Sequence, residues 1–389
     1  MMRRITCAGA VALALAACAD REPTTGPAVS GSTSPTSNGD SRSAGNLRGG
    51  AVYVMTNQPT GNGVTAFSRA SDGTLTLVGT FPTGGLGTGG PPDPLRSQGS
   101  LILRSNQLLF AVNAGSNEIS VLAVERDRLT LVCKTASGGV RPTSLTLHKD
   151  LLYVLNAGSG TITGFRVGHD GGLTPLAGST RPITGGAAAD PAQVEFTPDG
   201  KLLVVTGKMT NVIDTYGVDR EGSPSGPTPN ASNGLTPFGF AFDNRGNLIV
   251  SEAFGGAPNQ AALSSYTVSR DGVLKVVSGS VRDFQTAACW VVVTNDGRYA
   301  YTSNTGSSTV SSYRVHPDGV LKLLASVAAT TDPGSSPVDM ALSTGSRYLY
   351  VLNNVTGTID VFRVESDGGL SPVTGAGGLP PNAQGIAAR

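Results

Sequence analysis

The sequence predicts an all-β protein, a seven-bladed β-propeller with four strands in each blade. Residues 336–373 show the repeating unit most clearly, as four short runs of β-branched and aromatic residues separated by turns at Gly345 and 367–369. The second run, YLYVLN, recurs in related forms seven times, with ends 43 to 56 residues apart. A four-stranded unit repeating every 40–50 residues or so is typical of a propeller. The seven copies end at Asn57, Asn113, Asn156, Gly207, Glu252, Asn304 and Asn353.

An apolar first strand also occurs seven times, but this set is offset from the other along the chain. Its last copy, 385–388, lies at the C-terminus with no second strand after it, whereas the second strand at 53–57 has no first strand before it. We therefore expect 385–388 to pair beside 53–57, so that the end of the chain completes the first blade and closes the ring. Closure would remove exposed sheet edges, which favour aggregation. The other first strands are expected at 100–103, 144–147, 193–196, 239–242, 290–293 and 339–342.

The N-terminal segment carries targeting signals instead of strands. Two arginines precede a mostly apolar stretch, 5–17, which is too short to span a membrane and is typical of a signal peptide. It ends in the sequence LAAC, which resembles the signal box of bacterial lipoproteins and makes Cys18 the expected lipidation site; an ordinary secretory signal is the alternative. We expect a signal peptide at 1–17, a flexible Ser/Thr/Pro/Gly tether at 18–50 and the propeller at 51–389. The protein would be exported across the inner membrane and anchored by lipid in the cell envelope.

Composition excludes several classes of function. The 389 residues include 28 Lys and Arg against 27 Asp and Glu, so nothing indicates binding to nucleic acid. The three histidines fall in or beside predicted turns away from the funnel, which argues against a histidine-ligated metal or a Ser-His-Asp triad. No phosphate loop or dinucleotide fingerprint occurs. We expect no metal, no cofactor, a monomer, and two buried thiols at Cys133 and Cys289.

In a propeller, the starts of the first strands and the ends of the second strands meet on one face around the central funnel. The repeated Asn at five second-strand ends is best explained by turn formation. Residues that break the repeat are better functional candidates, because the fold does not require them. The exceptions at this mouth of the funnel are Glu252, Lys208, Asp339, Gln193 and Trp290. Arg96 and Arg141 precede first strands and could reach the same rim, the alternative being that each is a solvated loop residue.

These candidates suggest roles. Glu252 would act as a general base if it were desolvated, and Lys208 or Arg96 would stabilise an oxyanion or hold a carboxylate. Asp339, Gln193 and Trp290 would help to bind a small polar ligand that contains a ring. The structural alternatives are an ion pair between Glu252 and Lys208, and a core position for Trp290.

Three segments are predicted as long connections on this face. Residues 84–98 and 224–237 would join neighbouring blades, and 253–262 is an insertion next to Glu252. The insertion is either a lid or a loop without a function.

The unit P-x-x-x-x-x-S/T-x-D-G-x-x-x-Y-V-x-N, followed by a V-x-x-[FY]-x-V-x-x-D-G-x-L hairpin, resembles the seven-bladed lactonase family. That family includes bacterial 6-phosphogluconolactonase and the fungal carboxymuconate cyclase. The resemblance covers about 52–389, and it implies the propeller fold and action on a small lactone or cyclic acid. Where the family has Pro-His, this chain has Ala192 after Pro191, and where it has Pro-Arg-His, Phe238 and Gly239 follow Pro237. The family's Asn-Glu pair corresponds to Ser251 and Glu252, so the glutamate is kept.

Two functions follow as hypotheses. The first is a lipid-anchored lactonase, or a lactonising cycloisomerase, with Glu252 activating water or moving a proton. The alternative is a non-catalytic propeller at the cell surface, which would hold a glycan, a peptide or another envelope partner with its long loops.

Overall fold

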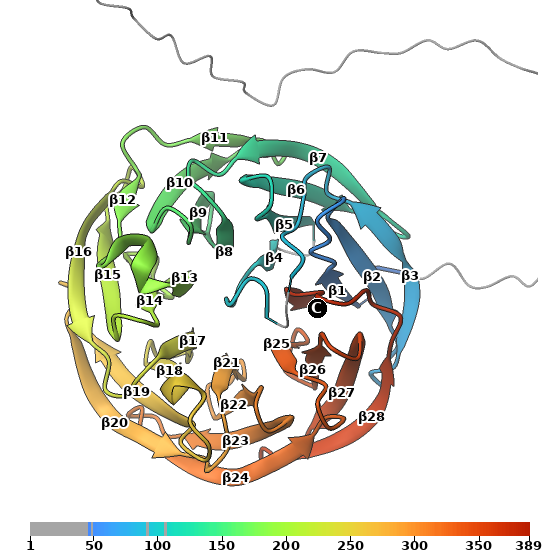
Figure 1. Cartoon of the computed structure of the whole chain (residues 1–389), viewed down its shortest axis with the longest axis vertical. Helices are drawn as coiled ribbons and strands as arrows, with labels where there is room; N and C mark the ends of the chain where they lie inside the picture. The colour runs from blue at the N-terminus through green and yellow to red at the C-terminus, as the bar shows by residue number, and fades with distance from the viewer. Residues whose placement is uncertain (1–45, 48–49, 91–92, 105–106) are drawn as a thin grey trace, which may run out of the picture.

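Seven antiparallel sheets surround a central axis as the blades of a propeller (Figure 1). The computed structural model describes residues 46–47, 50–90, 93–104 and 107–389. The all-β, seven-bladed architecture predicted from the repeats is therefore confirmed. The signal peptide, Cys18 and most of the tether lie outside the described residues.

Within each blade the strands follow one another from the axis to the rim. Blade one contains β29 (Ile386–Ala388), β1 (Ala51–Met55), β2 (Gly63–Arg69) and β3 (Leu75–Pro82); blade two contains β4 (Leu101–Arg104), β5 (Leu108–Asn113), β6 (Glu118–Val124) and β7 (Leu129–Ala136). Blade three contains β8 (Pro142–His148), β9 (Leu151–Asn156), β10 (Thr161–Val167) and β11 (Leu173–Pro175), with β12 (Arg181–Pro182) also on β10; blade four contains β13 (Pro191–Phe196), β14 (Leu202–Gly207), β15 (Val212–Val218) and β16 (Pro224–Ala231). Blade five contains β17 (Pro237–Phe242), β18 (Leu248–Glu252), β19 (Ala262–Val268) and β20 (Leu274–Arg282); blade six contains β21 (Ala288–Val293), β22 (Tyr299–Asn304), β23 (Thr309–Val315) and β24 (Leu321–Thr330). Blade seven contains β25 (Pro337–Leu342), β26 (Tyr348–Asn353), β27 (Thr358–Val364) and β28 (Leu370–Ala376).

The C-terminal strand closes the ring as predicted. In β29, Ile386 pairs with Val54 and Ala388 pairs with Val52, in antiparallel register. Figure 1 shows the C-terminus beside β1, at the inner edge of blade one. The first and last parts of the chain thus share one sheet, and the inner edge of β1 is covered.

One predicted connector is a strand instead. The sequence predicts a loop over 224–237, but Pro224–Ala231 forms β16, the outer strand of blade four, and pairs with β15. The prediction is wrong because the segment PSGPTPNA lacks the β-branched and aromatic residues of the inner strands. An edge strand tolerates proline, since alternate N–H groups point away from the sheet and need no partner.

The blades pack against one another through buried second strands. Tyr53, Tyr153, Tyr301 and Tyr350 are fully buried on these strands. The hydroxyls of Tyr153 and Tyr301 donate hydrogen bonds of 2.5 and 3.1 Å to the carbonyl oxygens of Gly222 and Gly368, in the turns of the next blades. Tyr153 and Tyr301 therefore link neighbouring blades by packing and by a buried hydrogen bond. The Tyr350 hydroxyl is equally buried but has no hydrogen-bond partner among the described residues.

Cys133 and Cys289 are buried and belong to different core clusters. None of the helices in the described part of the chain has the length and apolar character that a membrane span requires.

Candidate functional site

The central channel is closed near the mouth by residues 93–98, which belong to the connector between blades one and two. This segment leaves the outer strand of blade one and passes across the axis before it enters β4 (Figure 1). The Gln98 amide nitrogen donates to the carbonyl oxygen of Val291 at 2.8 Å, and its amide oxygen accepts from the Val291 N–H at 3.0 Å. The Gln98 main-chain N–H donates to Ala192 in blade four at 3.1 Å. We call residues 93–98 the plug.

Side chains from other blades hold the plug by its main chain. Trp290 donates from Nε1 to the Ser97 carbonyl at 3.0 Å, and Lys208 donates from Nζ to the Arg96 carbonyl at 2.5 Å. Gln384 accepts from the Leu95 N–H at 2.8 Å. These three contacts come from blades six and four and from the segment before β29. Two of the predicted site residues, Lys208 and Trp290, thus contact the same connector.

Trp290 is fully buried beneath the plug. Its ring lies 5.0 Å from the ring of Phe238, and Lys208 Nζ lies 4.6 Å from the centre of that same Phe238 ring. The tryptophan therefore combines the core position that was the structural alternative with a hydrogen bond to the plug.

Three cations converge on one carboxylate at the mouth. Asp190 lies 3.1 Å from Arg96, 3.7 Å from Arg141 and 3.6 Å from Lys208. The Arg96 and Arg141 side chains are 55% and 33% exposed, whereas that of Lys208 is 2% exposed. The carboxylate partner of Lys208 is thus Asp190, on the loop before β13, instead of Glu252. The mouth presents two solvent-accessible guanidinium groups with positive charge in excess, an arrangement suited to an anion.

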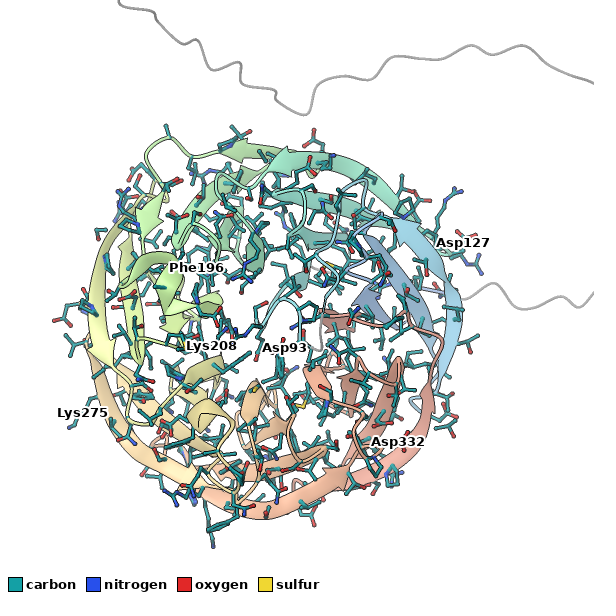
Figure 2. The ribbon with its side chains drawn as sticks, in the orientation of Figure 1. Asp93, Asp127, Phe196, Lys208, Lys275 and Asp332 are labelled. Atoms are coloured by element: carbon teal, nitrogen blue, oxygen red, sulfur yellow. The ribbon has the colours of Figure 1, made fainter. Side chains whose placement is uncertain are left out.

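Lys208 and Asp93 lie near the axis, Lys208 from the edge of blade four and Asp93 from the plug (Figure 2). Burial lowers the pKa of Lys208 to about 8, although the charges of Asp190 and Asp93 act in the opposite direction. Burial raises the pKa of Asp93 to about 6, against the opposing effect of Lys208. Asp93 Oδ1 accepts hydrogen bonds from Gln384 Nε2 at 2.6 Å and from the Arg96 N–H at 2.9 Å. The site therefore holds a carboxyl group, Asp93, and an amine, Lys208, whose pKa values both lie near neutral pH.

Glu252 lies apart from these groups, at the end of β18. It is fully buried, and burial raises its pKa. Its Oε1 accepts hydrogen bonds from the Gly234 N–H at 2.8 Å and from Ser264 Oγ at 2.5 Å, and its Oε2 accepts from Ser280 Oγ at 2.6 Å. All three donors belong to blade five or to the connector that leads into it, so both oxygens of Glu252 are engaged within the blade.

The Asn residues at the equivalent second-strand ends make similar contacts. Asn113 donates to Ser120 at 2.7 Å, and Asn304 donates to Ser311 at 2.8 Å, in each case on the next strand. Ser264 occupies the corresponding place beside Glu252. The insertion at 253–261, which includes the 3-10 helix η2 (Phe254–Gly256), lengthens the connection between the two strands of this blade.

Gln193 and Asp339 lie deeper in the channel than the arginines. Gln193 accepts a hydrogen bond from the Phe240 N–H at 2.7 Å and donates to Glu195 at 2.8 Å. Asp339 accepts from the Met340 N–H at 2.9 Å, and both residues line a cavity whose mouth-side end is Gln98. The structure thus places Arg96, Lys208 and Trp290 at the mouth and Gln193 and Asp339 in the channel. Glu252 lies apart from both groups.

Several residues of the site were not predicted. Asp190 and Asp93 adopt left-handed backbone conformations, with φ of 44° and 59°. The direction of their side chains therefore cannot be predicted from the alternating pattern of a strand. Gln98 and Glu195 fall in stretches whose patterns predict only a connector and a strand. The one available signal was Asp190 itself, because it directly precedes a first strand whose next positions break the repeat.

Among the described residues, no group of three or more His, Cys, Asp or Glu side chains is arranged to hold a metal ion.

Fold and site together define a class: a closed seven-bladed propeller with charged side chains gathered at one mouth of its channel. The chain belongs to the family described as lactonase, 7-bladed beta-propeller, whose profile matches residues 62–183 and 266–384. The interval between the matched segments, 184–265, includes Asp190, Gln193, Lys208 and Glu252. Asp93, Arg96 and Arg141 lie in the first matched segment and Trp290 in the second, so the site draws on both the matched and the unmatched parts of the chain.

Solved structures share the fold at low sequence identity. A candidate 6-phosphogluconolactonase of Bacteroides fragilis superposes with a TM-score of 0.64 and 18% identity, over 90% of this chain and all of that one. The periplasmic gluconolactonase of Pseudomonas aeruginosa gives a TM-score of 0.67 and 16% identity, over 87% of this chain and 98% of that one. A protein of Lactobacillus plantarum superposes with a TM-score of 0.69 and 18% identity, over 87% of this chain and 99% of that one. No curated protein matches the sequence.

Proposed function

We propose that this protein is a lactonase of the bacterial cell envelope, which hydrolyses a small lactone bearing an anionic group at the mouth of its propeller. The observation that carries the proposal is the convergence of Arg96 and Arg141 on Asp190, in a chain that belongs to the lactonase family. Guanidinium groups bind carboxylate and phosphate in paired hydrogen bonds, so two accessible arginines favour an anionic substrate.

Asp93 is the group best suited to activate water. Because its pKa is raised to about 6, it is mostly ionised at neutral pH and can accept a proton. Water would attack the lactone carbonyl carbon while Asp93 takes its proton, and Arg96 would stabilise the oxyanion. The ring C–O bond then breaks, the proton passes to the leaving alkoxide, and a hydroxy acid is released. Arg141 would hold the anionic group of the substrate.

Lys208 has a positioning role in this proposal. At 2% exposure it does not reach solvent, but it fixes the Arg96 carbonyl and adds positive charge beside Asp190. The catalytic role of Glu252 stays a prediction. Its three hydrogen bonds within blade five indicate a structural role. The lactone assay described next can also test whether Glu252 is catalytic.

The test is hydrolysis of matched pairs of lactones, each with and without a carboxylate substituent. We expect turnover of the anionic member, loss of kcat in Asp93→Asn, and a raised KM for anionic lactones alone in Arg141→Gln. Arg270→Gln, on an exposed turn at the opposite face, is the matched control and should behave as wild type. Equal turnover of both members in all variants would contradict the proposed site. Binding of anionic compounds without turnover would instead support the non-catalytic hypothesis.

The cellular location is a separate part of the proposal. It is supported by the signal pattern that ends in Cys18 and by the fold shared with a periplasmic gluconolactonase. Cys18→Ser should move the protein from the membrane fraction to the soluble fraction. Wild-type protein that is already soluble would rule out the lipid anchor.

A further inference from the structure

A cavity of about 330 Å³ occupies the central channel beyond the plug. Gln98 lies at its end nearest the mouth, and Leu103 and Leu147 line it close to the turns at the opposite face. Its polar lining is provided by Gln193, Glu195 and Asp339. The volume is at the lower end of the range for ligand pockets, so the cavity suits a small molecule.

Two carboxyl groups line this cavity without a cation beside them. Among the residues that the structure describes, no lysine or arginine forms an ion pair with Glu195 or Asp339. Glu195 accepts a hydrogen bond from Gln193 Nε2 at 2.8 Å. Asp339, which is 3% exposed, accepts main-chain hydrogen bonds from Met340 at 2.9 Å and Ile386 at 3.3 Å. Asp339 is buried and Glu195 is partly buried. A carboxylate removed from water is normally compensated by a positive charge, and the described residues supply none to either group.

The remaining walls indicate which cation would fit. Calcium and magnesium require about six to eight oxygen ligands, whereas this cavity offers two carboxyl groups, and aliphatic side chains such as Leu103, Leu147 and Met340 form part of its wall. A charged head with a short hydrocarbon chain satisfies both kinds of surface, because the ammonium contacts the carboxyl groups and the chain contacts the leucines.

We propose that the channel cavity binds a small alkylammonium ion, at a site separate from the mouth. The plug divides the two sites, because the Gln98 amide is hydrogen-bonded to Val291 on one side of the channel and its main-chain N–H to Ala192 on another. The site therefore does not depend on the proposed hydrolase activity.

Protonation is the competing way to neutralise these groups. Burial raises the pKa of Glu195 to about 8 and that of Asp339 well above its usual range, with the charge of Asp93 adding to the effect on Asp339. A bound ammonium ion favours the ionised carboxylates, so binding at neutral pH releases protons.

Trp290 provides a readout through the plug, because it is the only tryptophan of the chain and donates to Ser97, next to Gln98, which lines the cavity. The experiment titrates the whole protein with n-butylammonium, with n-butanol as the neutral control. Binding is followed by tryptophan fluorescence and by calorimetry in two buffers that differ in ionisation enthalpy. We expect saturable binding of butylammonium with proton release, and none of butanol.

Variants locate the site. Asp339→Asn and Glu195→Gln should each weaken butylammonium binding at least tenfold, whereas Glu221→Gln, at an exposed turn, should leave it unchanged. Using two channel variants covers the case in which one of them fails to fold. Absence of saturable binding, equal binding of butanol, or binding that is lost in Arg96→Gln but kept in both channel variants would overturn the proposal.

Discussion

Lys208 of blade four donates a hydrogen bond of 2.5 Å to the carbonyl oxygen of Arg96, which lies in the connector between blades one and two. This contact joins parts of the chain 112 residues apart, and the buried amine and the exposed Arg96 guanidinium pair with the same carboxylate, Asp190. The mouth of the propeller is therefore built from one rigid blade and one irregular segment, each of which positions the other.

Replacing Lys208 by Met should destabilise the protein by about 2 kcal/mol. The change removes the donor to the Arg96 carbonyl and one cation beside Asp190, and an unsatisfied buried group costs about 1–3 kcal/mol. The measurement is the free energy of unfolding in urea. Lys201→Met is the control, since that side chain is 68% exposed and pairs with Asp199, and it should change stability by less than about 0.5 kcal/mol. Equal losses in the two variants would show that Lys208 does not hold the plug.

Gly239 should be required by the plug. A Cβ at this position would overlap Gln98 Oε1 and lie 2.7 Å from the Cys289 carbonyl oxygen, which belongs to the backbone. Gly239→Ala should therefore cost about 1–3 kcal/mol, the usual range for overpacking. Gly61→Ala is the matched control, because nothing lies within 4 Å of the added Cβ. Thermal or urea unfolding of the two variants is the measurement, and similar midpoints would contradict the close approach of Gln98.

Glu252→Ala should destabilise blade five whether or not the residue is catalytic. The change leaves the Gly234 N–H and the Ser264 and Ser280 hydroxyls without their acceptor, at a cost of about 2–4 kcal/mol for the group. Glu252→Gln should cost less, because one oxygen remains. Stability and lactone turnover are measured on the same preparations. Loss of turnover in Glu252→Gln at unchanged stability would argue for the catalytic role instead.

The fold could be predicted closely because its signals are local and repeated. Each second strand carries its own apolar pattern, and the offset between the two strand sets was sufficient to pair 385–388 with 53–57. The outer strand β16 was missed because strands on the rim are selected by hydrogen bonding to β15, with little burial to mark them. Sequence patterns that depend on burial therefore describe the inner three strands of a blade better than the fourth.

The site was harder to predict, because its parts are brought together by an irregular connector. Lys208 was identified as an exception after a second strand and Arg96 as a residue that precedes a first strand, and the structure places them in contact. Asp190 and Asp93, which give this site its charge pattern, depend on left-handed backbone conformations that the residue types do not reveal. The exception at Glu252 had a local cause, since the glutamate takes the place of the Asn that bonds to the next strand elsewhere.

The rate of lactone hydrolysis should depend on pH with a maximum between about 6 and 8. Asp93 must be ionised to accept a proton, so kcat/KM should rise as the pH increases through its raised pKa of about 6. Lys208 must be protonated to hold the Arg96 carbonyl, so the rate should fall as the pH passes its lowered pKa of about 8. Asp93→Asn should abolish the acidic limb along with most of the activity, and a flat profile in wild type would exclude both assignments.

Removal of the last four residues, 386–389, should open the ring. Ile386, Ala387 and Ala388 pair with β1, and the Arg389 N–H donates to the Ala51 carbonyl, so the deletion exposes the inner edge of β1 and the apolar side chains behind it. The unpaired edge of β1 would then provide a template for association between chains. We expect a less cooperative urea transition, measured as a smaller slope, and oligomers in size-exclusion chromatography.

A synthetic peptide with the sequence of 384–389 should restore the wild-type slope and the monomer when it is added in excess, because it can supply the missing strand. If the truncated protein unfolded with the wild-type midpoint and slope, blade one would be stable with three strands, and its fourth strand would not be what holds the ring closed.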